Sequence, residues 1–92
     1  MKIIWSDRSI ERLGEIRSYI AREAPMTAGK VVANIIKSTE RLASFPLSGR
    51  VVPEYRIKEI REIIKAPYRI LYYAGKDRIE IINVLHSRQL LR

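Results

Sequence analysis

A single arginine interrupts an otherwise apolar segment of the chain. In KAPYRILYY (residues 65–73), Arg69 stands between Tyr68 and Ile70. The alternation of bulky residues here predicts a β-strand. A guanidinium group stays charged and binds phosphate oxygens through paired hydrogen bonds. Because a charge in the centre of an apolar strand costs stability unless it is paired or used, we expect Arg69 to contact a ligand or a target.

Other side chains near Arg69 and the C-terminal end offer chemistry of a more limited kind. His86, in VLHSRQLLR, carries an imidazole, the side chain that most often transfers protons in catalysis. The rings of Tyr68, Tyr72 and Tyr73 can stack on nucleic-acid bases, although Tyr68 and Tyr72 are expected in the core. Trp5 is expected in the core or at the sheet edge. One histidine, no cysteine and scattered carboxylates offer no metal site, so neither a metal nor another cofactor is expected.

Length and charge limit the classes of protein that this chain can belong to. Its 92 residues predict one domain, residues 1–92, and its formal net charge of +8 favours RNA, DNA or an acidic protein as partner. The lack of cysteine fits a reducing cytoplasm. No apolar run approaches the roughly 20 residues that span a bilayer, so neither membrane association nor a signal peptide is expected.

Two amphipathic helices are predicted in the first half of the chain. KIIW (residues 2–5) is typical of a strand, and Ser6 with Asp7 supplies a helix N-cap. The first helix is expected over Arg8–Ala24, ending before Pro25. Its apolar stripe consists of Ile10, Leu13, Ile16, Ile20 and Ala24. A second helix, capped by Thr27, is expected to run to Ala43 and to pack against the first as a hairpin.

After Gly49 the pattern changes to that of β-strands. The segments 56–64, 68–74 and 78–86 are rich in Ile, Val and Tyr and are separated by turn residues. They predict an antiparallel meander and an α+β fold of order β-α-α-β-β-β, with the helical hairpin on one face of a small, mostly antiparallel sheet. The other face would be free. If Tyr68 and Ile70 point to the helices, Arg69 lies exposed on that open face.

Several motifs, in this order, resemble the RelE/ParE superfamily of bacterial and archaeal toxins. The resemblance covers nearly the whole chain. Its carriers are MKIIWS, FPLSGR, the RE pair Arg61–Glu62, the YRI triplet Tyr68–Ile70, and the HxR of His86–Arg88. It implies a type II toxin–antitoxin module, in which an acidic antitoxin of the RelB or ParD kind silences the toxin. RelE-like members cut mRNA on the ribosome, whereas ParE-like members inhibit DNA gyrase without catalysis.

We expect the RelE-like activity, with ParE-like inhibition of gyrase as the alternative, and for this activity the resemblance implies roles for particular residues. Arg69 matches an arginine that contacts the phosphate, and Arg88 approximately matches a second one. Glu62 as base and His86 as acid would move the protons, without a metal. The candidates for binding RNA or another target are Lys58, Arg61 and Tyr73. We expect Arg61, Arg69, His86 and Arg88 to share the open sheet face, and Arg69→Ala to remove toxicity with little loss of folding.

Alternatives to these roles remain open at the level of sequence. Glu62 can pair with Arg61 or Arg69 across strands, His86 can hold the end of its strand, and Arg88 can be solvated or contact the antitoxin. The C-terminal tyrosine of many such nucleases is missing, and the HxR element is common in ParE-like gyrase inhibitors. A third possibility is a module without intrinsic activity that binds the antitoxin and acts as a co-repressor on DNA.

Overall fold

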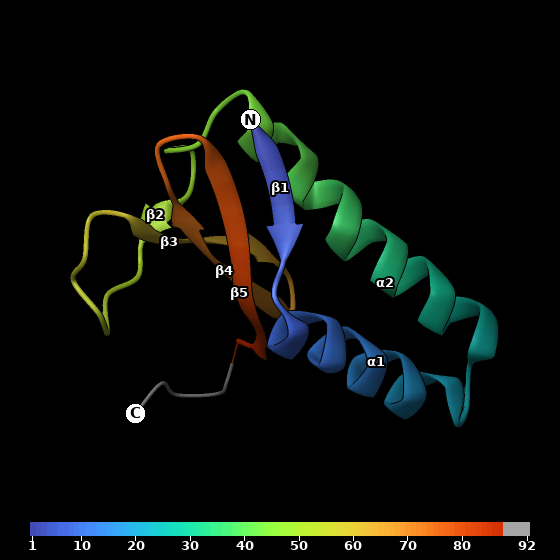
Figure 1. The fold of residues 1–92 in the computed structure, drawn as a ribbon. Helices are drawn as coiled ribbons and strands as arrows, with labels where there is room; N and C mark the ends of the chain where they lie inside the picture. Colours follow the sequence, from blue (N-terminus) through green and yellow to red (C-terminus); the bar gives the residue numbers. More distant parts are fainter. Residues whose placement is uncertain (88–92) are drawn as a thin grey trace.

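Two helices cover one face of a five-stranded sheet (Figure 1). The structure, a computed structural model, describes residues 1–87. Its elements are β1 (Lys2–Trp5), α1 (Asp7–Ala21), α2 (Pro25–Thr39), the 3₁₀ helix η1 (Glu40–Ala43), β2 (Arg50–Val51), β3 (Ile60–Lys65), β4 (Tyr68–Ala74) and β5 (Arg78–His86). The predicted α+β class and the order of helices and strands are confirmed. Among these residues, no helix is long and apolar enough to cross a membrane.

The sheet has the strand order β1-β5-β4-β3-β2. β1 runs parallel to β5, and the other neighbours are antiparallel. The predicted strands 68–74 and 78–86 are confirmed at their bounds. The strand expected over 56–64 begins only at Ile60, because residues 56–59 belong to the loop after β2. β2 itself was not predicted, since two residues are too few to show an alternation.

The predicted apolar stripe of helix α1 is confirmed at Leu13 and Ile16, which are buried, but not at Ile10. Ile10 is 55% exposed, and Ser9 is buried in its place. The hydroxyl of Ser9 donates to the carbonyl of Ile81 in β5, which is 3.1 Å away. Ser6 is the N-cap, as expected, and accepts a hydrogen bond from the backbone N–H of Ser9. A polar side chain therefore fixes this helix to the sheet at a position where the pattern predicted an aliphatic one.

The turn between the helices differs from the prediction in its capping. Helix α1 ends at Ala21, before the predicted end at Ala24, and Pro25 begins α2, where the missing N–H of proline is harmless because no helical acceptor precedes it. Thr27 therefore lies inside the first turn of α2 and does not cap it. The helical path continues to Ala43 as predicted, although its last turn is the 3₁₀ helix η1.

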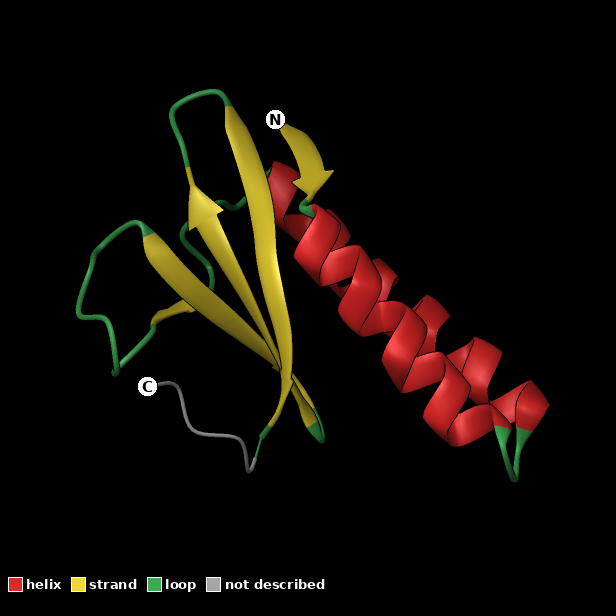
Figure 2. Ribbon diagram, turned by 60° about the horizontal axis from the view of Figure 1, so that its bottom comes forward, coloured by secondary structure: helices red, strands yellow, loops and turns green. Residues whose placement is uncertain are grey.

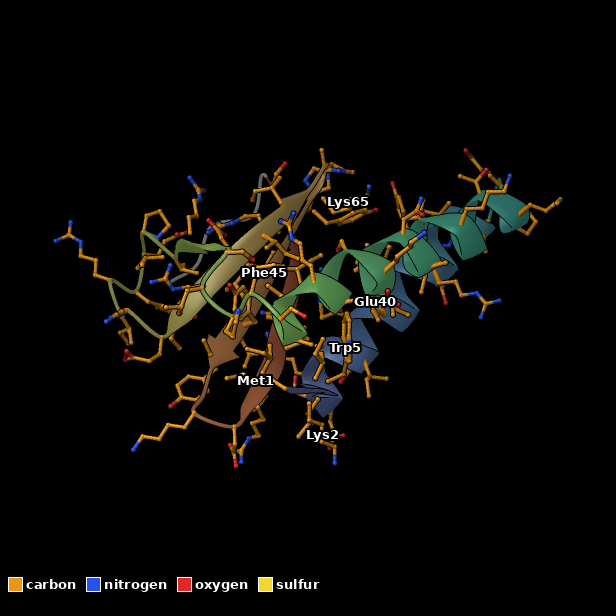
Figure 3. The ribbon with its side chains drawn as sticks, turned by 90° about the horizontal axis from the view of Figure 1, so that it is seen from above. Met1, Lys2, Trp5, Glu40, Phe45 and Lys65 are labelled. Carbon is orange, nitrogen blue, oxygen red and sulfur yellow. The ribbon has the colours of Figure 1, made fainter. Side chains whose placement is uncertain are left out.

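The sheet buries apolar side chains on both faces. The larger core lies under the helices and includes Ile35 and Leu42 together with Ile70, Tyr72 and Ile81. Trp5, shown beside the α2–η1 segment in Figure 3, packs against this core, as does Tyr68. On the opposite face, a small cluster is formed by Val52, Leu71 and Leu85. That face is therefore partly covered by the chain that follows β2, and the expectation of a fully open face is wrong.

Tyr72 ties the loop between η1 and β2 to the centre of the sheet. Its buried hydroxyl donates to the carbonyl of Pro46 at 2.8 Å and accepts from the N–H of Gly49 at 2.9 Å. Burial raises the pKa of Tyr72 above its ordinary value, so the hydroxyl keeps the proton that it donates. At Gly49 a Cβ atom would lie 2.5 Å from the carbonyl oxygen of Glu62 and 2.7 Å from the Tyr72 hydroxyl.

We expect Gly49→Ala to lower the free energy of unfolding by about 1–3 kcal/mol, because the added methyl group forces the loop away from β3 and β4. Gly14→Ala is the matched control, since a Cβ atom there meets nothing within 4 Å and Gly14 lies inside α1. That change should raise stability by up to about 1 kcal/mol. Urea denaturation measures both, and equal effects of the two variants would contradict the close approach at Gly49.

Candidate functional site

Arg69 lies at the centre of a buried network of charges. Its Nη1 and Nη2 atoms donate to the two carboxylate oxygens of Glu54 at 2.8 and 2.9 Å, and its Nε atom donates to Glu62 at 2.6 Å. The residue is only 7% exposed, so the prediction that it lies exposed on an open face is wrong. The hydrogen bonds that Arg69 donates to Glu54, and then the one that it donates to Glu62, raise the pKa of Arg69 against the opposing effect of burial, so the guanidinium remains charged.

Glu62 connects two arginines across three strands. Its side chain is 0% exposed, and its second oxygen accepts a hydrogen bond from Nε of Arg50 in β2. The strand register places Glu62 opposite Arg50 on one side and Leu71 on the other. Glu62 therefore pairs with Arg69, one of the two partners that the sequence suggested, while the ion pairs found here do not join it to Arg61.

Arg61 fixes the loops at the edge of the sheet. Its Nε atom donates to the carbonyl of Lys58 at 2.9 Å, and its Nη1 atom donates to the carbonyl of Gly49 at 2.9 Å. Because Arg61 pairs with Tyr72 in the register, it belongs to the helix-facing side of β3. Lys58 is exposed in the loop before β3, and Tyr73 is exposed on the face that bears Arg69.

His86 lies on the opposite face of the sheet from Arg69. It pairs with Tyr68 in the register, and the two rings meet edge to face at 6.0 Å. Since Tyr68 packs against the core under the helices, His86 also points to that side. It lines a groove of about 460 Å³ with Tyr68 and residues of α1, namely Arg12, Glu15, Ile16 and Tyr19.

The four residues expected on one functional surface are therefore not brought together. Arg69 faces away from the helices, whereas Arg61 and His86 belong to the side that the helices cover. Successive side chains of a strand point to opposite faces, so a shift of one position separates residues by the thickness of the sheet. Arg88 lies outside the described residues. Within residues 1–87, no three His, Cys, Asp or Glu side chains gather in a way that could hold a metal ion.

Two members of the charge network around Arg69 were not predicted from the sequence: Glu54, which pairs with Arg69, and Arg50, which pairs with Glu62. Glu54 lies 15 residues before Arg69 in an exposed, proline-led loop, where a glutamate usually signals no more than a solvated surface. Arg50 lies in a strand of two residues. The available signal was the place of Arg69 in the centre of an apolar strand, because a guanidinium that is buried there needs carboxylate partners. The sequence does not say which of the ten acidic residues supplies them.

We expect Arg69→Ala to lower the free energy of unfolding by about 3–5 kcal/mol, since it leaves the buried carboxylate of Glu62 short of its main partner. This expectation reverses the one drawn from sequence. Arg50→Ala is the matched control, because it removes a guanidinium from the same carboxylate at a side chain that is mostly exposed. Its cost should be about 1 kcal/mol or less. Chemical denaturation measures the free energy of unfolding of both variants. Similar losses in the two would show that the ion pair of Arg69 with Glu62 adds little to stability.

Comparison with known proteins places this fold in a family. A family model described as the ParE toxin of the type II toxin–antitoxin system, parDE, matches residues 3–91. The Y4kP protein of Sinorhizobium fredii is 41% identical over 90 residues, which cover 96% of this chain and 90% of that protein. Toxin RelE2 of Caulobacter vibrioides is 26% identical over 89 residues, covering 97% of this chain and 98% of that protein.

A solved structure described as the chromosomal ParDE TA system from P. aeruginosa shares the fold. One chain of that structure superimposes on this one with a TM-score of 0.80 and 18% sequence identity. The superposition covers 94% of this chain and 95% of that chain. The fold, the match of the family model over nearly the whole length and the relative at 41% identity agree with the motifs of the sequence. The chain belongs to the family of ParE toxins of type II toxin–antitoxin systems, within the RelE/ParE superfamily.

Proposed function

We propose that this toxin acts without catalysis and inhibits DNA gyrase, as the ParE-like alternative implies. The observation that carries the proposal is the state of Arg69. All three guanidinium nitrogens of Arg69 donate to carboxylates of the same chain. A phosphate group of mRNA would have to displace Glu54 or Glu62 from a largely buried position, so Arg69 is poorly placed to bind it.

The proton-transfer groups that cleavage needs are also poorly placed. A general base must come within hydrogen-bond reach of the proton that it takes. Glu62 has no exposed side-chain surface and already binds two guanidinium groups. His86 lies on the other face of the sheet. An acid and a base on opposite faces do not flank one phosphate, which supports an activity that needs neither.

An antitoxin is the partner that the type II family implies. We propose that an acidic antitoxin segment of the ParD or RelB kind lies in the groove beside α1. Tyr19, which is 74% exposed, stands at the rim of this groove, and Ile16 and Tyr68 line it. An amphipathic helix could bury this apolar surface. The net charge of +8 attracts an acidic chain.

The target is tested by inducing the toxin in a sensitive bacterial host while labelling newly made DNA and protein in parallel pulses. We expect DNA synthesis to fall first, with an SOS response and filamentation, while protein synthesis continues. In vitro, the purified protein should inhibit supercoiling of relaxed plasmid by gyrase and leave mRNA intact in a cell-free translation reaction.

The opposite result has a clear meaning. Prompt loss of translation with cut mRNA, while DNA synthesis continues, would overturn the proposal and favour RelE-like cleavage, the activity suggested by the name of the Caulobacter relative. Arg69, Arg88, His86 and Glu62 would then return as candidates for catalysis, and Arg69 would have to exchange Glu54 for the phosphate. If induction slows neither DNA synthesis nor protein synthesis in growing cells, the result favours the third alternative, a module that binds the antitoxin and has no activity of its own.

A further inference from the structure

The loop that joins β2 to β3, residues 53–59 (PEYRIKE), stands away from the rest of the molecule. Figure 1 and Figure 2 both show it projecting from the sheet on the side away from the helices. Its tip exposes Tyr55 and Ile57, at 43% and 46%, and also the side chains of Arg56 and Lys58. Four consecutive residues thus present an aromatic ring, an aliphatic side chain and two positive charges.

The base of the loop is held at several points. Glu54 binds both terminal nitrogens of Arg69, which is buried in the sheet. The buried Val52 accepts hydrogen bonds at its carbonyl from the N–H groups of Tyr55 and Arg56, at 3.1 and 3.0 Å. At the far end, the carbonyl of Lys58 accepts from the guanidinium of Arg61. A loop fixed in this way loses little conformational entropy when it binds.

Arg56 has a backbone conformation that an arginine rarely adopts. Its φ angle is +54°, in the left-handed region that favours glycine or asparagine. Within residues 1–87, the side chain of Arg56 makes no hydrogen bond or ion pair, so the fold itself gives no reason for an arginine at this position. Residues kept in such conformations cluster at functional sites. The strained backbone of Arg56 therefore makes its side chain a candidate for contact with a partner.

The chemistry of the tip favours a protein partner over a nucleic acid. Tyrosine and arginine supply much of the binding energy in protein interfaces. Ile57 offers nothing to a phosphate backbone, whereas it can fill an apolar pocket. Of the two glutamates in the loop, Glu54 is neutralised by Arg69, and Glu59 stands next to β3 at the base. The partner surface should thus be acidic around a small apolar centre.

We propose that loop 53–59 is the element by which this toxin contacts its protein target, and that Arg69 is the residue that positions it. The proposal rests on the proposed function, in which that target is gyrase. The loop and the groove beside α1 lie on opposite sides of the sheet. A chain that fills the groove therefore leaves room for contact at the loop.

The test uses Arg56→Gly, because glycine removes the guanidinium group and also relieves the strained φ angle. We expect the melting temperature to stay unchanged or rise, while affinity for purified gyrase falls about tenfold or more, which corresponds to about 1.4 kcal/mol. Lys76→Gly is the control, since it removes the same charge from the exposed turn between β4 and β5 and should change affinity less than threefold. The double variant Tyr55→Ser/Ile57→Ser should also fold and lose affinity.

Glu54→Gln tests the positioning role of Arg69. It removes the charge that holds the loop, so hydrogen exchange at residues 55–58 should become faster while exchange in β4 stays unchanged. Affinity for gyrase should fall by a smaller factor than in Arg56→Gly. Unchanged exchange at the loop would overturn the positioning role.

The possible outcomes distinguish failure of the loop proposal from failure of the proposed function. If the wild-type protein binds gyrase and both tip variants bind it equally well, the loop proposal is overturned and the proposed function stands. If the wild-type protein does not bind gyrase, the proposed function fails, and the protein partner assigned to the loop fails with it. If Arg56→Gly instead loses binding to ribosomal RNA, the loop contacts a nucleic acid and the choice of partner made here is wrong.

Discussion

The arrangement of strands β2, β3 and β4, and of the loop between β2 and β3, depends on the ion pairs of Arg69. A guanidinium buried in the middle of a strand is tolerated only when carboxylates surround it. Glu62 meets it from β3, and Glu54 meets it from the loop after β2. The same Glu62 binds Arg50, so three strands and one loop share a single network. Without the pair of Glu54 and Arg69, the loop would be held mainly by backbone contacts.

The resemblance to the RelE/ParE superfamily implies two alternative activities, and our proposal of one of them rests on the surroundings of Arg69. An arginine at this position in the sequence motif suggests contact with a phosphate, as in RelE-like nucleases. In this chain the neighbouring carboxylates occupy all the nitrogens through which it would do so. The residue type is therefore shared with the nucleases, while its surroundings favour a structural role. Function follows from the partners of the arginine, which the motif alone does not contain.

Much of the fold could be predicted because it is local. The strands of Tyr68–Ala74 and Arg78–His86 follow from alternation and turn residues, and Ser6 follows from the chemistry of helix caps. The site could not be predicted, because it depends on register and on pairs distant in sequence. The segment 56–64 was predicted as one strand because a short turn and another strand follow it, although the structure places residues 56–59 in the loop. The alternation of Tyr68 and Arg69 gave the correct sides, but it did not show that a loop would cover Arg69.

The most direct test of this account follows the Nε–Hε group of Arg69 by NMR in ¹⁵N-labelled protein. The account predicts one resolved signal that exchanges slowly with water, because Nε donates to the buried carboxylate of Glu62. It also predicts that the signal does not shift when inorganic phosphate or a short RNA is added. A saturable shift of this signal with either ligand would show that Arg69 gives up its carboxylates to bind phosphate, and would contradict the central claim.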